Sequence, residues 1–325
     1  MEPLFLKSVT KDYIWGGQKL KKLFGKKSSG DNIAESWELS CHNDGCSIVA
    51  GGKNGNVSLT SYIKAHGRKQ ILGTDCEHVN NVPLIKLIDA KEPLSVQVHP
   101  DDEYARSKGS SNGKTEMWYI LDADEGAEIV YGLSATLTKE ELRSHAEKGT
   151  LDIVLKYVPV KKGDVFYIPA GTIHAIGKGI LLAEVQQNSN LTYRLYDYKR
   201  LDADGKERPL HIDDAIEAAK LTPGVWENPY PVWRFPWGEK QTLSYCQYFV
   251  TNSITVLNER KFEVKNNSFT HILVTDGMGL LFTESHDYQI KKGDSILLPA
   301  GTGVCRINGS IRYIETYLPP KEEYK

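Results

Sequence analysis

The sequence predicts a mainly β protein, built of antiparallel β-sandwich units with a few inserted helices. Short segments rich in β-branched and aromatic residues recur along the chain. Gly, Pro and Asp-Gly turns separate them, which is typical of sandwiches and barrels. The segment 161–172, with the sequence KKGDVFYIPAGT, also recurs 130 positions later as KKGDSILLPAGT at 291–302. The chain is therefore expected to contain two related β units.

The expected elements follow in chain order. Strands are expected at 95–99, 117–121, 127–132, 164–168, 179–186, 271–275 and 294–298. Helical spacing is confined to three segments, 59–72, 138–148 and 211–221. The second of these begins with the capping-box sequence TKEE, in which Thr138 is the expected N-cap and Glu141 its partner. Helices are therefore expected to be additions to a β framework.

A change in composition marks the expected boundary between the two units. Residues 222–240 hold four of the fourteen prolines and three of the six tryptophans, which favours an ordered crossing segment over a flexible linker. We therefore predict domains at 1–235 and 236–325. A looser match of 119–121 with 271–273, at an offset of 152, indicates that the first unit equals the second plus a helical insertion.

Composition excludes several classes of function. The 40 basic and 42 acidic side chains give a formal net charge of −2, so no global field favours nucleic acid. No apolar run approaches the roughly 20 residues that span a bilayer, and no secretory h-region is recognisable near residue 1. The five scattered cysteines, without a C-x-x-C motif, are expected to be free thiols. We therefore expect a cytoplasmic protein with no membrane or nucleic-acid partner.

Four side chains form a candidate metal site. The pattern Gly163-x5-Pro169-x-Gly171-x2-His174 indicates a strand, a glycine turn and a histidine pointing into a barrel; it matches the second cupin motif, with Lys178 where that motif usually ends in Asn. Upstream, Gln97 and His99 alternate along one strand face, and Glu116 enters the next expected strand. Two imidazoles, a carboxylate and an amide oxygen suit a divalent metal.

The ligand types favour Zn²⁺, and Fe²⁺, Mn²⁺ and Co²⁺ stay open as alternatives. A lone histidine such as His174 is more often structural, and only the combination of all four residues favours a metal. In the second copy His174 aligns with Val304, and Glu116 aligns with about Ser268. The second unit therefore keeps the turn without the ligands, and we expect it to be a degenerate, metal-free jelly roll and the chain to bind one ion.

Several segments together resemble the type I mannose-6-phosphate isomerase family in its short bacterial form. They lie at 15–17, 34–40, 93–102, 114–119, 169–175, 184–189 and 192–198. The resemblance runs from about Trp15 to the C-terminus. It implies a cupin fold, one Zn²⁺ per chain and reversible conversion of mannose 6-phosphate to fructose 6-phosphate.

The resemblance also implies roles for particular residues. The metal ligands carry over to Gln97, His99, Glu116 and His174. The active-site arginine carries over to Arg194. One departure from the family is Asn190, which stands where relatives often have Asp. An amide cannot serve as that carboxylate.

The isomerisation needs groups beyond the metal. Arg194 is expected to stabilise the developing enediolate; the alternative is a structural salt bridge with Asp197 or another carboxylate. Lys114 is a candidate proton carrier, because it lies two residues before Glu116 on the same strand face. A solvent-exposed lysine at the strand edge is the alternative for Lys114, and a metal-bound water and His99 are rival proton carriers.

Three further residues are candidates for the substrate pocket. Ser95 shares the strand face of Gln97 and His99, and Arg200 follows six residues after Arg194. Both are candidates to bind the phosphate, and either could instead be a plain surface residue. Trp15 could wall the sugar pocket, although a core tryptophan is the default interpretation.

Two other functions stay open at this point. A non-catalytic cupin that binds a sugar phosphate would keep the metal ligands without needing Arg194. A redox cupin, such as an Fe²⁺ oxygenase, would use the same kind of fold; Gln97 among the ligands argues against it. The expected partner of the chain is a small sugar phosphate, and the sequence carries no signal of the oligomeric state.

Overall fold

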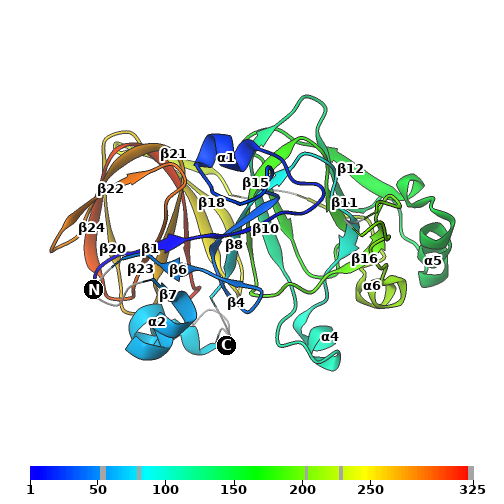
Figure 1. Ribbon diagram of the computed structural model, residues 1–325, viewed down its shortest axis with the longest axis horizontal. Coiled ribbons are helices and arrows are strands. Elements are labelled where there is room, and N and C mark those ends of the chain that lie inside the picture. Colours follow the sequence, from blue (N-terminus) through cyan, green and yellow to red (C-terminus); the bar gives the residue numbers. More distant parts are fainter. Residues whose placement is uncertain (52–55, 79–81, 202–203, 227–229, 321–325) are drawn as a thin grey trace.

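The computed structural model describes residues 1–51, 56–78, 82–201, 204–226 and 230–320. It consists mainly of antiparallel strands arranged in two β units that lie side by side (Figure 1). Most of the first unit is coloured cyan and green and most of the second yellow to red, and each also contains strands from the blue N-terminal part of the chain. The prediction of a mainly β fold with few helices is confirmed. No helix in the described part of the chain is long and apolar enough to cross a membrane.

The first unit is a sandwich of two sheets. One sheet has the order β13 (Val165–Ile168), β10 (Glu116–Ala123), β15 (Ile180–Gln186), β8 (Leu84–Ala90), β3 (Glu35–Leu39), β2 (Val9–Lys11). The other has the order β12 (Leu155–Pro159), β11 (Glu128–Leu133), β14 (His174–Ile176), β9 (Val96–Val98), β16 (Tyr193–Tyr196). Buried apolar side chains from both sheets pack between them, among them Trp118, Phe166 and Ile129. This shared core holds the two sheets face to face.

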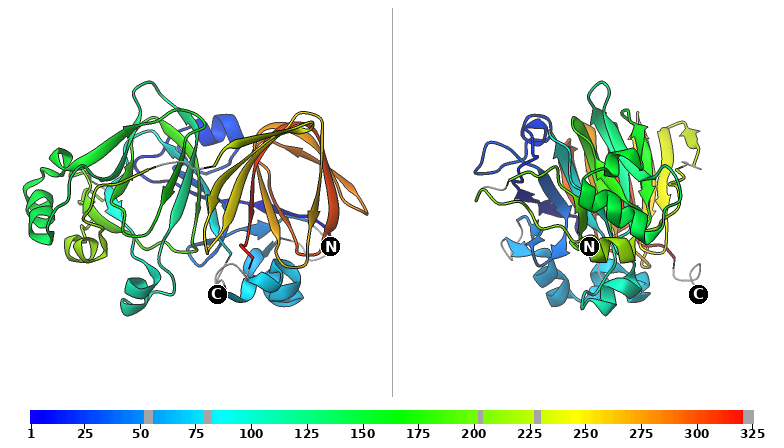
Figure 2. Two further views of the ribbon diagram at one scale, coloured as in Figure 1. Left: turned by 180° about the vertical axis from the view of Figure 1, so that it is seen from behind. Right: turned by 90° about the vertical axis from the view of Figure 1, so that its right-hand side faces the viewer.

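Helices cover the outer face of the five-stranded sheet. α5 (Lys139–Lys148) and α6 (Ile212–Ala218) lie at the outer end of the first unit (Figures 1 and 2). Val96 and Val98 of β9 pack with them in one buried cluster. Successive strand residues point to opposite faces, so Gln97 points into the sandwich. The packing of the helices therefore fixes which β9 side chain reaches the interior.

The predicted helices are found, with one break. The capping box of α5 is formed, with Glu141 N donating to Thr138 Oγ1 and Thr138 N donating to Glu141. The segment 59–72 divides at Gly67 into α2 (Leu59–His66) and α3 (Arg68–Leu72), because Gly67 has a φ of 92°. Shorter elements also occur: α1 (Lys19–Phe24), α4 (Asp102–Ser107), and the 3₁₀ helices Thr74–His78 and Leu151–Ile153.

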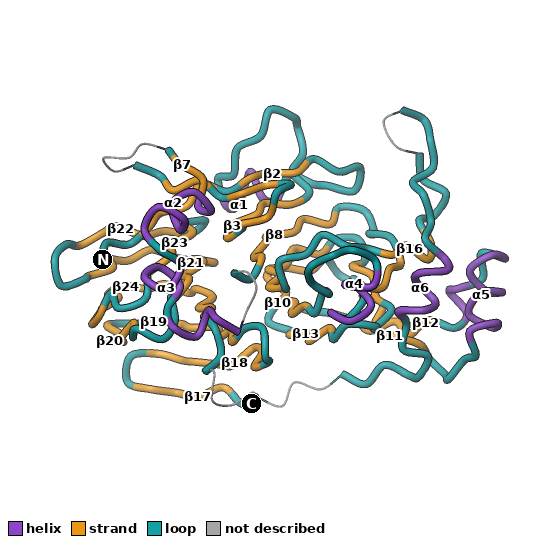
Figure 3. Tube along the Cα trace, turned by 90° about the horizontal axis from the view of Figure 1, so that it is seen from below, coloured by secondary structure: helices purple, strands orange, loops and turns teal. Residues whose placement is uncertain are grey.

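The second unit is built on one sheet of eleven strands. Its main path is β17 (Val232–Phe235), β18 (Gly238–Tyr245), β19 (Val250–Val256), β24 (Gly303–Tyr317), β21 (Thr270–Phe282), β23 (Ser295–Leu298), β1 (Leu4–Lys7), β6 (Ile48–Val49), β7 (Val57–Ser58). β20 (Glu259–Val264) pairs with β24, and β22 (Asp287–Lys291) pairs with β21. α2 and α3 lie beside this unit (Figure 3).

The N-terminal segment belongs to the second sheet. β1 pairs antiparallel with β23, with Leu4 opposite Leu297, and β6 and β7 extend the same edge. A buried cluster that contains Leu4, Met117 and Leu273 also joins the two units. The division at 235/236 stays a prediction; β1 and β17 both lie before it in the chain although they belong to the sheet of the second unit.

Strand pairing corrects the alignment of the repeat. β13 matches β23 at the predicted offset of 130, since Ile168 and Leu298 occupy equivalent places. Glu116 lies opposite Ile168, and Thr270 lies opposite Leu298. The counterpart of Glu116 in the second unit is therefore Thr270, and the predicted counterpart near Ser268 was wrong. The offset between β10 and β21 is 154, because the segment between β10 and β13, which contains α5, is longer than the segment between β21 and β23. Val304 is 40% exposed, so it cannot occupy the inward place that His174 holds.

Candidate metal centre and active site

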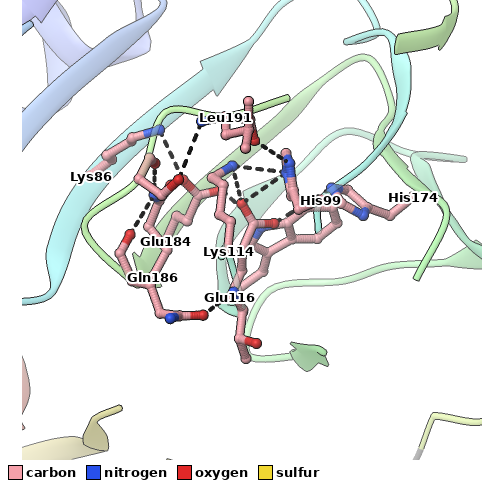
Figure 4. Close-up of polar contacts among 12 residues, drawn as sticks. Lys86, His99, Lys114, Glu116, His174, Glu184, Gln186 and Leu191 are labelled. Atoms are coloured by element: carbon pink, nitrogen blue, oxygen red, sulfur yellow. Dashed lines mark hydrogen bonds and ion pairs between the residues drawn. The ribbon is translucent and has the colours of Figure 1, made fainter. Parts of the chain in front are cut away.

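Three side chains meet inside the first unit. His99 follows β9, Glu116 begins β10 and His174 begins β14, and each is at most 1% exposed (Figure 4). Their candidate ligand atoms all lie within 4.8 Å of one another. Glu116 Oε1 lies 3.3 Å from His99 Nε2, and its Oε2 lies 3.5 Å from His174 Nε2. Among the described residues this is the one such group of His, Cys, Asp and Glu side chains.

Both imidazoles are oriented by a backbone carbonyl. Nδ1 of His99 donates to Leu191 O at 2.8 Å, and Nδ1 of His174 donates to Thr172 O at 2.8 Å. A carbonyl only accepts, so each Nδ1 carries the proton and each Nε2 presents a lone pair to Glu116. His174 Nε2 is buried without a hydrogen-bond partner in the described part of the chain. An oriented, unpartnered imidazole nitrogen beside a carboxylate fits a metal ligand.

The protonation states suit metal binding. Burial lowers the pKa of His174, and burial together with the Lys114 ammonium lowers the pKa of His99 to about 3. Burial alone would raise the pKa of Glu116, but the Lys114 ammonium and His99 hold it well below its usual value. Two neutral imidazoles and one carboxylate are the forms that bind a divalent ion.

Gln97 lies beside this cluster. In the ladder of β14 and β9 it stands directly opposite His174, and in the ladder of β9 and β16 it stands opposite Arg194. Directly opposed residues of antiparallel strands share a face, so these three side chains point to the same side. The side chain of Gln97 also lines the cavity described below. Its role as the fourth ligand stays a prediction.

Lys114 joins the cluster to the cavity. Its Nζ lies 2.8 Å from His99 Nε2 and forms an ion pair with Glu116 (Figure 4). The side chain is buried, and it also lines the cavity. The predicted proton carrier therefore lies between the candidate ligands and the space where a substrate would bind.

A cavity with an empty volume of about 720 Å³ opens beside the cluster. Most of the predicted site residues line it: Trp15, Ser95, Gln97, Lys114 and Arg194. Trp15 is 3% exposed and packs in the core of the first unit, and its role as a wall of the sugar pocket stays a prediction. Asn190 lines the cavity as well, and its Nδ2 donates to Asp44 Oδ2 at 2.9 Å.

Arg194 is not held in a salt bridge with Asp197. Asp197 is taken by two other arginines: Arg200 donates to it at 2.5 Å, and Arg208 donates to both carboxylate oxygens at 2.5 and 2.6 Å. Arg194 Nε is buried without a hydrogen-bond partner among the described residues. Burial and the nearby Arg208 guanidinium lower the pKa of Arg194, because both disfavour its positive charge. An anion in the cavity would offset this unfavourable interaction.

Arg200 lies away from the cluster. Besides Asp197, its guanidinium donates to Pro93 O at 2.5 Å, and it lines a separate cavity. The structure does not bring it together with the other predicted residues. Arg208, which the sequence reasoning missed, lines the main cavity in its place. Arg208 lies in a loop, where no strand periodicity marks which way a side chain points.

A second group of charged residues in the cavity wall was also missed. Lys86 Nζ lies 3.1 Å from Glu184 Oε1 and 3.5 Å from Glu35 Oε2, and all three residues are buried. Burial and the Glu116 carboxylate raise the pKa of Glu184. The signal was present, because Lys86 and Glu184 each interrupt an apolar strand sequence.

These features define a cupin with a candidate metal centre in one of its two β units. Residues 4–142 match the model of the phosphomannose isomerase type I catalytic domain, and residues 239–318 match the mannose-6-phosphate isomerase cupin domain. The chain is 40% identical to the mannose-6-phosphate isomerase ManA of Bacillus subtilis, over 98% of this chain and 99% of that one. It is 38% identical to the mannose-6-phosphate isomerase of Streptococcus mutans, over 97% and 98%. The chain belongs to the type I phosphomannose isomerase family.

Solved structures agree on the fold. The crystal structure of the mannose 6-phosphate isomerase from Bacillus subtilis superposes with a TM-score of 0.90 at 36% identity, covering 97% of this chain and 99% of that chain. A zinc-bound mannose 6-phosphate isomerase superposes with a TM-score of 0.80 at 17% identity, covering 98% and 100%. The cupin fold implied by the sequence is confirmed over nearly the whole chain.

Proposed function

We propose that this protein catalyses the reversible isomerisation of mannose 6-phosphate to fructose 6-phosphate with one zinc ion per chain. The observation that carries the proposal is the buried His99, Glu116 and His174 cluster, whose lone pairs converge beside a cavity lined by cationic side chains. The relatives that match nearly the full length are named as isomerases of this sugar phosphate.

Zinc would be held by His99, Glu116 and His174, with the Gln97 amide oxygen as the fourth ligand. The unpartnered Nε2 of His174 supports this assignment. Nitrogen and oxygen donors without a thiolate suit a catalytic zinc site that keeps room for substrate. When bound, zinc supplies Lewis-acid polarisation of the sugar oxygens at C1 and C2.

The chain's own residues supply the remaining chemistry. The Arg194 guanidinium stabilises negative charge on the enediolate, because Arg194 lines the cavity and its buried Nε has no hydrogen-bond partner among the described residues. Lys114 carries the proton between C2 and C1, since its Nζ lies at the boundary between cavity and cluster. His99 is less suited to that role, because its Nδ1 is committed to Leu191 O.

Three residues would bind the rest of the substrate. Ser95 is buried in the cavity lining and offers a hydroxyl to the phosphate. Arg208 would bind the substrate phosphate, the role predicted for Arg200, because Arg208 lines this cavity and Arg200 does not. Trp15 contributes one wall of the sugar pocket.

We also propose a cytoplasmic location, which suits the five free thiols.

An isomerase assay tests the function. The zinc-loaded protein should convert mannose 6-phosphate, followed by coupling fructose 6-phosphate to glucose 6-phosphate formation. Turnover should disappear when a chelator removes the zinc and return when zinc is added, because the protein ligands cannot polarise the sugar oxygens without the ion. Tight sugar-phosphate binding without product would instead support the non-catalytic cupin. Oxygen consumption by an Fe²⁺-loaded sample would support the redox cupin.

Metal-saturated protein should contain one zinc ion per chain. The second unit has Thr270 where the first has Glu116, and a barrel-facing cysteine, Cys305, near the place of His174. Elemental analysis measures the ratio. Val304→His is the matched control: it should also bind one ion, because position 304 points outward. Two tightly held ions per chain in the parent protein would contradict the single site.

A further inference from the structure

Two of the five cysteines face each other on a short hairpin. β4 (Cys41–His42) and β5 (Gly45–Cys46) form a two-stranded sheet in which Cys41 stands directly opposite Cys46. Both are partly exposed, whereas Cys76, Cys246 and Cys305 are buried. The hairpin lies between β3 and β6 in the chain, and both cysteines pack against a buried apolar cluster. Neither is a candidate metal ligand, and the proposed isomerisation does not use them.

The backbone pattern brings the two sulfur atoms close together. Ser47 N donates to Ser40 O at 2.9 Å, so positions 40 and 47 form a hydrogen-bonded pair. Hydrogen-bonded and non-hydrogen-bonded pairs alternate along an antiparallel ladder, which makes Cys41 and Cys46 a non-hydrogen-bonded pair. The Cα atoms of such pairs are typically about 4.5 Å apart, within the range that a disulfide spans. The two thiols also influence each other directly.

The two thiols differ in reactivity. Cys46 Sγ lies 3.3 Å from Thr60 Oγ1, in the first turn of α2. The Cys41 and Thr60 side chains lower the pKa of Cys46 to about 5. The Cys46 side chain and burial raise the pKa of Cys41. The thiolate form is therefore favoured at Cys46.

We propose that Cys41 and Cys46 are a reversible redox pair that forms a disulfide across the hairpin when a small-molecule disulfide such as oxidised glutathione is present. The Cys46 thiolate attacks one sulfur of that disulfide, which forms a mixed disulfide and releases one thiolate. The Cys41 sulfur, after losing its proton to the released thiolate, attacks the sulfur of Cys46. The second glutathione leaves, so the protein is oxidised by two electrons and two glutathione thiols are produced.

The hairpin connects this pair to the cavity wall. Asp44, which lies in the turn between β4 and β5, accepts a hydrogen bond from the cavity residue Asn190. His42 packs edge-on against the Trp37 ring, with centroids 5.7 Å apart, and Trp37 Nε1 donates to Glu35 of the cavity at 2.6 Å. A disulfide across the hairpin would therefore restrain one side of the proposed substrate pocket without touching a candidate metal ligand.

The test follows the two thiols by mass spectrometry in the zinc-loaded, full-length protein. The tryptic peptide 28–53 contains Cys41, Cys46 and no other cysteine. Reduced protein is incubated with oxidised glutathione at neutral pH, quenched with acid, alkylated and digested. The peptide should lose two hydrogen atoms and resist alkylation, and dithiothreitol should reverse both changes. A parent peptide that stays fully alkylated, or that ends as a stable glutathione adduct, would overturn the proposal.

Single substitutions assign the two roles. Cys41→Ser should stop at a glutathione adduct on Cys46, because nothing resolves it. Cys46→Ser should react at least tenfold more slowly, since the thiolate is gone. Cys246→Ser, which removes a buried cysteine, is the matched control and should form the hairpin disulfide like the parent. Equal adduct formation in both hairpin variants would refute the assignment of Cys46 as the attacking sulfur.

Discussion

His174→Ala should lose its zinc and its activity together. The imidazole contributes an oriented, unpartnered Nε2 to the centre of the cluster, and no neighbouring side chain can replace it. Loss of a residue that merely supports a ligand costs about 10–100-fold in metal affinity or activity, and loss of the ligand itself should exceed this. Zinc content and turnover, measured on the same purified sample, check the prediction.

His271→Ala is the matched control for this experiment. His271 is also a fully buried histidine on a strand, but it lies in the second unit and contacts Ser295 Oγ at 2.9 Å. Its loss should leave the zinc content at one ion per chain, even if the melting temperature falls. A His174→Ala protein that kept full zinc and normal turnover would exclude His174 from the ligand set.

Arg194→Ala should lower kcat by about 10²–10³-fold while the zinc content stays the same. The guanidinium lies in the cavity wall with an unpartnered Nε, so it can stabilise charge that develops only in the transition state. Arg194→Lys should rescue poorly, because an ammonium cannot reproduce the planar fork of donors. The measurements are kcat, KM, zinc content and melting temperature on each variant.

Arg200→Ala separates this role from a structural one. Arg200 ties Asp197 to Pro93 O outside the main cavity, so its loss should reduce the melting temperature more than kcat. If Arg194→Ala instead affects KM alone, Arg194 binds the phosphate and not the enediolate. Normal turnover of a folded, zinc-loaded Arg194→Ala protein would remove it from the mechanism and reopen the binding-protein alternative.

The parts of the site that the sequence predicted depend on local rules. Alternation along β9 places Val98 in the helix-packed core and its neighbours Gln97 and His99 on the opposite, inner side. The turn from Pro169 to His174 carries its own glycine signal, and Gly171 has the positive φ of 86° that such a turn needs. Side chains fixed by a strand or a tight turn could therefore be assigned from residue spacing.

Features set by long-range contacts could not be predicted in this way. Arg200 and Arg208 lie near the same carboxylate, and only the path of the loop decides which one faces the main cavity. The alignment of the two repeats is a second example. β10 corresponds to β21 through their pairing with β13 and β23, and a short sequence match did not capture this correspondence. Pairing of β1 with β23 likewise has no local signal, since it joins segments almost 300 residues apart.

That pairing of β1 with β23 has a consequence for how the chain is made. In its sheet β1 lies between β6, which is made early, and β23, which is made almost last, so during translation one edge of β1 must wait for its partner. Contacts between such distant segments carry a large loop-closure entropy and slow folding. Until β23 emerges, the apolar side chains of Leu4 and Leu6, both buried in the finished protein, stay open to other partners, including chaperones and neighbouring nascent chains.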